Sequence, residues 1–379
     1  MAKYRFEQIA INSTEKKKPV AQDRFTYLGL EHLDSGSLKV TRFGSEVAPI
    51  GEKLVMHKGD VLFGKRRAYQ KKVAIAPFDG IFSAHGMVLR PKEDVIDRDF
   101  FPLFISSDYF LDAAIKISVG SLSPTINWRD LKELEFELPN METQRKLADV
   151  LWSINDTMEA YKKLIVATDE LVKSQFMEQF GDVHENPNGW KVIKLGDICE
   201  VLNGYAFKSK LYVNEGIRVI RITNVQKGYI EDSDPQFYPL SYESELSRYM
   251  LTGGDILLSL TGNVGRVGLL PEEMLPAALN QRVACLRMKN ENVVSKMFFY
   301  SMINTDFFES DCIASSQGIA QKNMSTEWLK EYPVIIPPKP MQKAYVDFVQ
   351  QSEKSKFELL NALAELTALY KRIIQDNLS

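Results

Sequence analysis

A dense group of basic side chains lies within residues 53–72. This stretch holds seven Lys or Arg residues against one acid, Asp60, and so has a local charge of +6. Lys and Arg attract phosphates, and an Arg guanidinium can also donate two hydrogen bonds to a guanine edge. A charge run is more commonly a solvated hairpin, but this one follows a glycine turn, a usual place for a recognition loop. We therefore expect nucleic-acid contacts from Lys65, Arg66, Arg67, Tyr69, Gln70, Lys71 and Lys72.

Loops rich in amides and hydroxyls supply a second set of candidates. Asn and Gln side chains can recognise adenine edges, and small polar donors can bind phosphates. The simpler interpretations are a glycine turn for residues 261–266 and helix capping for residues 118–127 and 315–323. For His85, the simpler interpretation is a packed or water-bonded imidazole. The candidate contacts are Ser83, His85, Ser121, Ser123, Thr125, Asn127, Thr261, Asn263, Arg266, Asn280, Gln281, Arg282, Gln317, Gln321, Lys322 and Asn323.

Residues that could support catalysis or bind a metal form no recognisable motif in the sequence. Asp60 and Asp255 each precede an apolar run, where Asp favours a turn, and no second acid recurs beside both. The four histidines lack metal-ligand spacing, and the three cysteines indicate neither a disulfide framework nor a zinc site. The sequence has neither a phosphate-binding P-loop nor an Asn/Asp-Pro-Pro-aromatic motif of amino-methylation. We therefore predict no catalytic residue, no metal site and no cofactor bound by this chain.

The elements that must position the candidate contacts occur twice. When the chain is shifted by 198 residues, residues 100–149 and 298–347 share 14 identities in 50 ungapped positions. A Gly-Asp-(Val/Ile)-Leu sequence also occurs twice, at residues 59–62 and 254–257. Each half contains short β-branched runs, a Phe-containing helix and a polar loop, and residues 134–138 alternate as a half-buried strand does. Two copies indicate a pseudo-twofold pair and not a solenoid.

Each half is predicted to end in one long helix. Residues 142–180 contain neither Pro nor Gly, and apolar residues recur at heptad spacing there and in residues 340–379. A helix of this length spans roughly 58 Å and needs a partner for its apolar seam. The obvious partner is the other copy, in antiparallel pairing, although heptads do not exclude pairing between two chains. The predicted seam residues are Leu147, Leu151, Ile154, Met158, Tyr161, Ile165, Val172, Tyr345, Val349, Leu359, Leu363, Leu366, Tyr370 and Ile373.

These features predict an α+β fold in which two pseudo-twofold-related mixed α/β domains are separated by two long antiparallel coiled-coil helices. The first domain would span residues 1–141 and the second residues 181–339, with the long helices over residues 142–180 and 340–379. The net charge of −3 is compatible with nucleic-acid binding, because the acids would lie on the helices. No apolar signal core and no run of about 18 apolar residues occurs, so we expect a cytoplasmic protein without membrane contact.

Several motifs recur in an order that is characteristic of one family. Residues 186–190 (Asn-Pro-Asn-Gly-Trp) and 195–198 (Leu-Gly-Asp-Ile) open the second half. Residues 316–323 then contain Ser-Gln-Gly and Gln-Lys-Asn, before Pro337-Pro338 and a long helix. Together with the repeated Gly-Asp motif, this order resembles the specificity subunits of type I restriction–modification systems over nearly all 379 residues. The first half differs, because it opens with residues 4–19 and lacks the Gly-Trp pair.

The resemblance implies that residues 1–141 and 181–339 are target recognition domains that bind double-stranded DNA. Each domain would recognise one half of a split, asymmetric target, while the long helices set the spacing and dock two methyltransferase (modification) subunits. Restriction/translocase subunits would complete the complex, and the partners would bind S-adenosylmethionine, ATP and Mg. The chain itself would be non-catalytic. The alternatives are a coiled-coil scaffold and a self-contained DNA-modifying enzyme with an unrecognised site.

Overall fold

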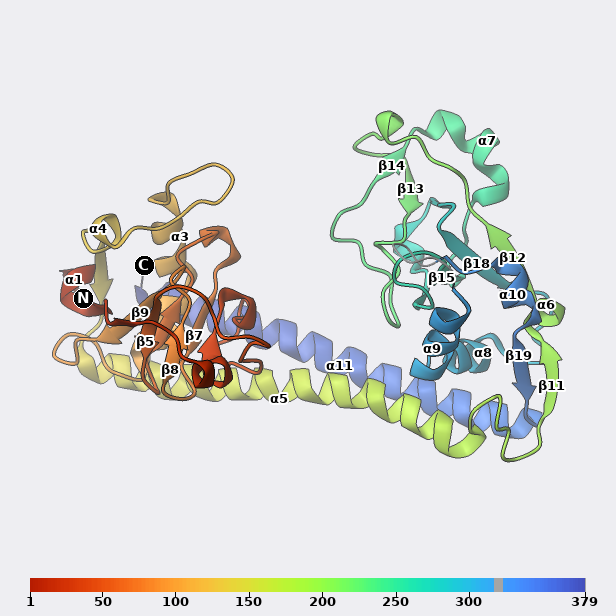
Figure 1. Cartoon of the computed structure of the whole chain (residues 1–379), viewed down its shortest axis with the longest axis horizontal. Helices are drawn as coiled ribbons and strands as arrows, with labels where there is room; N and C mark the ends of the chain where they lie inside the picture. The colour runs from red at the N-terminus through yellow and green to blue at the C-terminus, as the bar shows by residue number, and fades with distance from the viewer. Residues whose placement is uncertain (317–322, 379) are drawn as a thin grey trace. The chain divides into compact units, whose positions relative to one another are not determined.

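The structure is a computed structural model that describes residues 1–316 and 323–378 (Figure 1). Its internal contacts divide the chain into two units. The first unit comprises Met1–Lys163 with Leu359–Ser379, and the second comprises Leu164–Glu358. Each unit contains one mixed α/β domain together with a segment of both long helices. The predicted α+β class is therefore confirmed.

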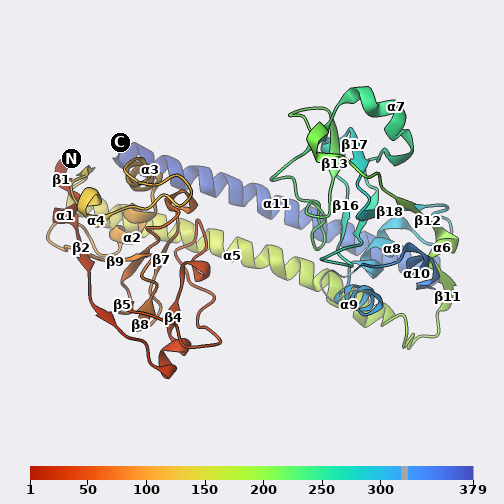
Figure 2. The ribbon, with the colours of Figure 1, turned by 45° about the horizontal axis from the view of Figure 1, so that its top comes forward.

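The strands of the first unit form three small sheets (Figure 2). They are β1 (Ala2–Arg5), β2 (Ala10–Ser13), β3 (Lys16–Lys17), β4 (Tyr27–Leu28), β5 (Lys53–Met56), β6 (Val61–Phe63), β7 (Val73–Ile75), β8 (Gly80–Phe82), β9 (Met87–Pro91) and β10 (Glu135–Leu138). One sheet pairs β1 with β10, another has the order β2-β9-β6-β7, and the third has the order β3-β5-β8-β4. The pair of β4 with β8 is parallel and the other pairs are antiparallel. The alternating residues 134–138 form β10, whose Phe136 and Leu138 are buried, as the period of 2 predicts.

Short helices cover these sheets and complete the first core. They are α1 (Phe6–Ile9), α2 (Phe100–Ser106), α3 (Asp108–Lys116) and α4 (Trp128–Leu131), with 3-10 turns at Ala21–Phe25, Leu30–His32 and Ala68–Gln70. Phe104, Phe110 and Phe136 are fully or almost fully buried together. The rings of Phe104 and Phe136 meet edge to face, with centroids 5.3 Å apart, which is a favourable geometry for aromatic pairs.

The strands of the second unit repeat this plan. They are β11 (Lys191–Lys194), β12 (Cys199–Asn203), β13 (Ile217–Ile220), β14 (Phe237–Tyr238), β15 (Ile256–Ser259), β16 (Val267–Leu269), β17 (Ala277–Leu279), β18 (Val283–Met288) and β19 (Pro333–Ile336). The pair of β11 with β19 matches β1 with β10, and the sheet β12-β18-β15-β16 matches β2-β9-β6-β7. A third sheet has the order β14-β13-β17, in which β13 and β17 are parallel.

The helices of the second unit follow the same order. They are α6 (Leu195–Ile198), α7 (Glu243–Leu246), α8 (Lys296–Ile303), α9 (Asp306–Ser315) and α10 (Thr326–Glu331), with 3-10 turns at Ser209–Leu211, Leu240–Tyr242, Ser247–Tyr249 and Glu272–Met274. Equivalent hydroxyls cap α3 and α9. Ser107 Oγ accepts the Phe110 N–H, and Thr305 Oγ1 accepts the Phe308 N–H, both at 3.2 Å. The duplication seen in the sequence is thus a duplication of backbone structure.

The start of the first domain is also a copy of the start of the second. Residues 2–13 form β1, α1 and β2, just as residues 191–203 form β11, α6 and β12. The Gly-Trp pair that marks the second half is absent here, yet Phe6 and Leu195 are equally buried in the first turn of α1 and α6. The buried apolar residue therefore defines this element better than the motif does.

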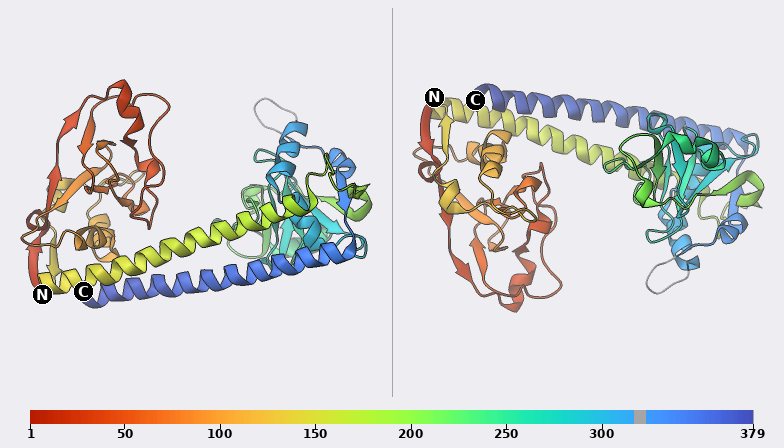
Figure 3. Two further views of the ribbon diagram at one scale, coloured as in Figure 1. Left: turned by 90° about the horizontal axis from the view of Figure 1, so that it is seen from below. Right: turned by 90° about the horizontal axis from the view of Figure 1, so that it is seen from above.

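The two long helices are α5 (Met141–Phe180) and α11 (Lys339–Leu378). In the second unit, the Asp169 carboxylate pairs with Lys356 at 2.6 Å, and the Val172 carbonyl accepts a hydrogen bond from the Tyr345 hydroxyl at 3.1 Å. Because positions rise along α5 as they fall along α11, the two segments are antiparallel there. Figure 3 shows the segments side by side within each unit. In the first unit, Ile374 belongs to the same buried cluster as Leu151.

The buried face of α5 contains residues, two of them polar, that the apolar pattern did not predict. Gln144, Ala148 and Asn155 are buried on α5, in addition to the predicted Leu151 and Met158. Positions 144, 148, 151, 155 and 158 have heptad spacing and form the buried line of α5. The predicted Leu147, Ile154 and Tyr161 lie beside this line. Tyr345 and Val349 are also buried. The remaining predicted residues are half-buried: Leu147, Ile154, Tyr161, Ile165, Val172, Leu359, Leu363, Leu366, Tyr370 and Ile373.

Two buried glutamines anchor the long helices to their domains in the same way. Gln144 accepts the Asp97 N–H at 2.8 Å and donates to the carbonyls of Val95 and Pro139. Gln342, which lies 198 residues later, accepts the Ser295 N–H and donates to the two equivalent carbonyls. Both side chains are 1% exposed. A buried amide that satisfies three backbone groups fixes the orientation of the helix start.

Candidate nucleic-acid interface

Three loops of the first unit meet at one edge of the sheet that contains β6 and β9. They are residues 64–72, 83–86 and 118–127, and together they form the first loop cluster. The Arg66 N–H donates to the His85 carbonyl at 3.3 Å, and the Ile126 N–H donates to the Lys65 carbonyl at 2.9 Å. The structure therefore brings together candidate contacts from three separate stretches of sequence.

The exposed side chains of the first loop cluster are mostly polar or basic. Arg66, Arg67, His85, Ser121 and Asn127 are exposed, and the Tyr69 ring is 57% exposed. Arg67 has a φ of 54°, a left-handed conformation that residues other than glycine seldom adopt. This conformation places the Arg67 side chain at the start of the 3-10 turn Ala68–Gln70. Such a surface suits contact with phosphates and base edges.

The charge of Lys16 adds to the surroundings of the first loop cluster. Burial, followed by the charge of Lys16, lowers the pKa of Lys65. Burial also lowers the pKa of His85, and the charges of Arg66, Lys65 and Lys53 lower it further. Lys16 was not among the predicted residues, because it lies 49 positions before Lys65 in the sequence. The run Lys16–Lys18 was the available signal, and the pairing of β3 with β5 places Lys16 opposite Leu54.

Several predicted contacts of the first unit are buried or have partners within the domain. Lys71 Nζ lies 2.7 Å from carboxylate oxygens of both Asp108 and Asp112. Lys72 Nζ donates to the Leu30 carbonyl at 2.7 Å, and the Gln70 carbonyl accepts a hydrogen bond from the Ser35 hydroxyl. Ser83 is 6% exposed. The structure thus gives Lys71, Lys72 and Ser83 positions that hold the loops in place.

The second unit repeats the arrangement with different side chains. The second loop cluster consists of residues 259–266 and 280–283 together with Asn323. The Leu260 N–H donates to the Arg282 carbonyl at 3.0 Å, and the Met324 N–H donates to the Leu260 carbonyl at 2.9 Å. Asn323 also forms a β-bridge with Thr261, as Thr125 does with Arg66 in the first unit.

The predicted contacts of the second unit differ in exposure. Asn263, Gln281, Arg282 and Asn323 are exposed, whereas Asn280 is half-buried. Thr261 is 7% exposed, which reduces its access to a ligand. Arg266 is half-buried and donates to the Gln226 Oε1 at 2.7 Å. The predicted contacts Gln317, Gln321 and Lys322 lie outside the described residues. The predicted contacts Ser123 and Thr125 of the first unit are half-buried.

The repeated Asp60 and Asp255 hold turns, as the sequence predicted. Asp60 is 7% exposed, accepts two hydrogen bonds from Arg90 at 2.7 and 2.9 Å, and accepts the His57 N–H at 2.8 Å. Asp255 makes the equivalent contacts with Arg287 and the Thr252 N–H. Burial would raise the pKa of Asp255, but these hydrogen bonds and the Arg287 charge lower it overall. Both carboxylates are thus occupied by structural partners.

The remaining reactive groups of the described residues form no metal or redox centre. Within residues 1–316 and 323–378, no three His, Cys, Asp or Glu side chains are grouped as metal ligands would be. Cys199, Cys285 and Cys312 are buried and free, and burial raises the pKa of Cys199 to about 12. No helix in the described part of the chain is both long and apolar enough to cross a membrane.

Comparison with known proteins agrees with this duplicated arrangement. A model of the type I restriction modification DNA specificity domain matches residues 25–167 and again residues 187–367. The MjaVIII specificity subunit of a type I restriction enzyme, from Methanocaldococcus jannaschii, is 23% identical over 89% of this chain and 85% of its own length. The EcoAI specificity subunit from Escherichia coli is 36% identical over 33% of this chain and 22% of its own length.

Two solved structures share the fold. One, from a study of complex assembly and conformational transition of the type I R-M system, has a TM-score of 0.58 and 18% identity, and covers 99% of this chain and 97% of its own. The other, the S subunit of a type I restriction–modification system from M. genitalium, has a TM-score of 0.53 and 15% identity, and covers 100% and 96%. At these identities the likeness shows the fold alone.

The duplicated domain, with one loop cluster in each copy, defines a two-domain DNA-recognition protein. The two matches to the specificity domain cover most of the chain, so the chain belongs to the type I restriction modification DNA specificity family. It is accordingly a DNA-recognition subunit of a type I restriction–modification system.

Proposed function

We propose that each unit recognises one half of a split DNA target through its own loop cluster. The observation that supports this proposal is the recurrence of one backbone arrangement with different exposed side chains. In this part of the chain the halves align with a shift of 195 residues, as the Gly-Asp motifs at 59–62 and 254–257 show. Arg66 and Arg67 then align with Thr261 and Gly262, which are not basic. Because different donors and acceptors match different base edges, the two half-sites would differ in sequence, and the target would be asymmetric.

The target recognition domains would be residues 1–141 and 181–339, and the long helices would set the distance between the half-sites. Affinity would come mainly from phosphate contacts, and specificity from the exposed Arg, Asn and Gln side chains. Two methyltransferase subunits would dock on the long helices, and restriction/translocase subunits would join them. Those partners would bind S-adenosylmethionine, ATP and Mg, and this chain would be non-catalytic.

The surfaces of the long helices support the docking part of the proposal. Both helices expose large apolar side chains to solvent, which a docked partner would cover. In the first unit they are Val150, Leu360 and Leu369, and in the second unit Leu164, Val166, Leu171, Met177, Met341 and Phe357. Burial of such side chains is the main driving force for protein association.

The experiment that tests the proposal is selection of bound fragments from a pool of random duplex DNA, followed by sequencing. The purified chain is assayed with and without a methyltransferase subunit at several salt concentrations. We expect enrichment of two short motifs separated by a fixed unrecognised spacer. Enrichment of a single motif, or steep salt dependence without any motif, would contradict recognition by two separate units.

A further inference from the structure

An aspartate at the start of α3 in the first unit, and one at the start of α9 in the second unit, each pair with a lysine from a loop. Asp108 opens α3 and Asp306 opens α9, exactly 198 residues apart, and each directly follows the hydroxyl that caps its helix. Their side chains are 48% and 78% exposed. An isolated ion pair at such exposure contributes little to stability. An acid in the first turn also interacts favourably with the helix dipole, so what distinguishes these two aspartates is the set of partners that each carboxylate contacts.

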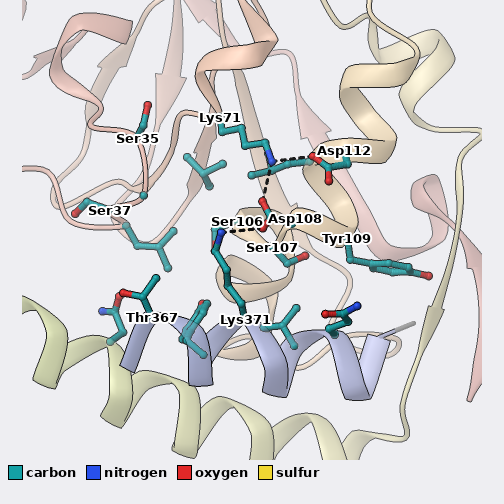
Figure 4. Close-up of a pocket in the computed structure, with 18 of the residues that line it drawn as sticks. Ser35, Ser37, Lys71, Ser106, Ser107, Asp108, Tyr109, Asp112, Thr367 and Lys371 are labelled. Carbon is teal, nitrogen blue, oxygen red and sulfur yellow. Dashed lines mark hydrogen bonds and ion pairs between the residues drawn. The ribbon is translucent and has the colours of Figure 1, made fainter. Parts of the chain in front are cut away.

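In the first unit, Asp108 is the centre of a three-part network (Figure 4). Lys71, the last residue but one of the 64–72 loop, lies 2.7 Å from Asp108 and 2.7 Å from Asp112. Lys371 of α11 approaches the other Asp108 oxygen at 3.3 Å. The hydrogen bond from Lys71 lowers the pKa of Asp108, and the charges of Lys71 and Lys371 add to the effect. The loop is thereby connected to the long helix through one carboxylate.

On either side of Lys71 the loop has other contacts, since Lys72 donates to the Leu30 carbonyl and the Ser35 hydroxyl donates to the Gln70 carbonyl. The network borders a hollow of about 910 Å³, which is lined by Lys71, α3, residues 35–38 and both long helices. A hollow supplies no van der Waals contacts that could replace the ion pairs. Lys71 also has a left-handed backbone, with a φ of 48°. A non-glycine residue keeps such a conformation only where its surroundings hold it.

The second unit makes the equivalent link with different residues. The 195-residue shift aligns Arg266 with Lys71, but Arg266 donates to Gln226 at 2.7 Å. Lys227, which follows Gln226 in the chain, lies 2.8 Å from both Asp306 and Glu309. The hydrogen bond from Lys227 lowers the pKa of Asp306, and the charge of Lys173 on α5 contributes too. Lys227 lies outside the second loop cluster, and the contact between its neighbour Gln226 and Arg266 connects it to that cluster.

We propose that Asp108 and Asp306 are positioning residues for sequence recognition, in which Asp108 fixes the first loop cluster relative to α11 and Asp306 supports the second loop cluster through Lys227. The inference rests on the proposed function. Base discrimination requires that side chains be held within about 0.5 Å of a productive geometry. The same network assigns Lys71 to positioning and not to phosphate contact, in contrast to the prediction from its sequence context.

The test compares Asp108→Asn, Asp306→Asn and Lys71→Met with the wild-type chain in the same random-DNA selection. Asp108→Asn and Lys71→Met should each reduce discrimination at one half-site by on the order of tenfold, since a good base contact contributes about that much or more. Asp306→Asn should do so at the other half-site. The slope of log affinity against log salt concentration should not change, whereas loss of a phosphate contact lowers it by about 0.9.

The matched control is Glu135→Gln, which removes an ion pair of similar exposure. Glu135 is 48% exposed and pairs with Lys3 at 2.7 Å, but it joins β10 to β1 and touches no loop cluster. It should leave both half-sites unchanged. Wild-type preferences in all three test variants would overturn the inference while leaving the split motif, and so the proposed function, intact. A lower salt slope in Lys71→Met would make Lys71 a phosphate contact. If the wild-type chain itself enriches no split motif, the proposed function fails first, and the inference with it.

Discussion

The two loop clusters have one backbone plan and two chemistries. In the first unit, Lys16, Lys65, Arg66 and Arg67 gather around the loops, whereas the second exposes Asn263, Gln281, Arg282 and Asn323. The frame beneath them is the same, since Asp60 pairs with Arg90 where Asp255 pairs with Arg287. The difference shows that the buried frame and the exposed contacts are separable. The frame fixes where contacts can be made, and the exposed side chains determine what they recognise.

The largest effect is expected from removing the basic pair of the first loop cluster. Arg66→Ala with Arg67→Ala should weaken DNA binding by roughly 10- to 100-fold, because each arginine can contribute a base or phosphate contact. The salt slope should fall, and only the half-site recognised by the first unit should lose specificity. Fluorescence anisotropy at several salt concentrations and sequencing of selected DNA measure these changes.

The comparison becomes sharper with Arg282→Ala, the matched change in the second loop cluster. It should relax the other half-site and leave the first one intact. Loss of specificity at both half-sites in either variant would mean that the clusters do not act separately. Unchanged affinity and preference in the double variant would remove the first loop cluster as a DNA contact.

The repeated carboxylate frame should fail in one unit at a time. Asp255→Ala leaves Arg287 and the Thr252 N–H without their acceptor, at a cost of about 1–3 kcal/mol in the free energy of unfolding. Hydrogen exchange followed by mass spectrometry should show faster exchange within residues 164–358. Asp60→Ala is the matched variant and should act on the first unit instead. Faster exchange spread evenly over both units would contradict separate frames.

The contribution of Asp255 to stability has a defined pH dependence. The pKa of Asp255 in the folded chain lies below its ordinary value of 3.8, so its carboxylate stabilises the fold at neutral pH. This contribution is lost as the pH falls below that value and the carboxylate takes up a proton. The difference in unfolding free energy between wild type and Asp255→Ala should therefore be full at pH 7 and shrink in acid, as measured by urea titration. A difference that grows in acid would have the wrong sign.

The smallest effect is expected from Lys16, which the structure adds to the first loop cluster. Lys16→Gln should lower the salt slope by about 0.9 and leave base preference unchanged, as expected of a phosphate contact. Lys17→Gln is the control, since successive strand side chains point to opposite faces and Lys17 pairs with Asp23 at 2.9 Å. An equal loss of slope in both variants would assign the effect to net charge and not to position.

The frame could be predicted from the sequence wherever a local pattern was sufficient. The strand at residues 134–138 and the two long helices follow from periodicity, since burial on one face imposes period 2 or 3.6, and the 198-residue repeat follows from residue identities between the halves. The positions of the loops in the chain could also be predicted. The sequence alignment of Ser83–Gly86 with Asn280–Val283 agrees with the structure, in which both segments form the same turn. The Gly86 N–H donates to the Ser83 carbonyl, and the Val283 N–H donates to the Asn280 carbonyl.

The parts that could not be predicted depend on residues far apart in sequence. Lys16 joins the first loop cluster through pairing of β3 with β5, and Lys71 turns away from it because Asp108 lies within reach. Gln144 and Gln342 can be buried because backbone groups of the domain satisfy their amides, and an apolar pattern does not reveal such partners.

By itself, then, the sequence determined the duplication, the α+β class, the long helices and the segments that hold candidate contacts, because these depend on local periodicity and on turns. Only the tertiary structure decided which charges face solvent and which face one another. A charge has the same sequence signature in both situations, and its role depends on the partner that the fold brings within about 3–4 Å. In this chain that distinction separates Arg66 and Arg67, which remain exposed, from Lys71, which is held by Asp108 and Asp112.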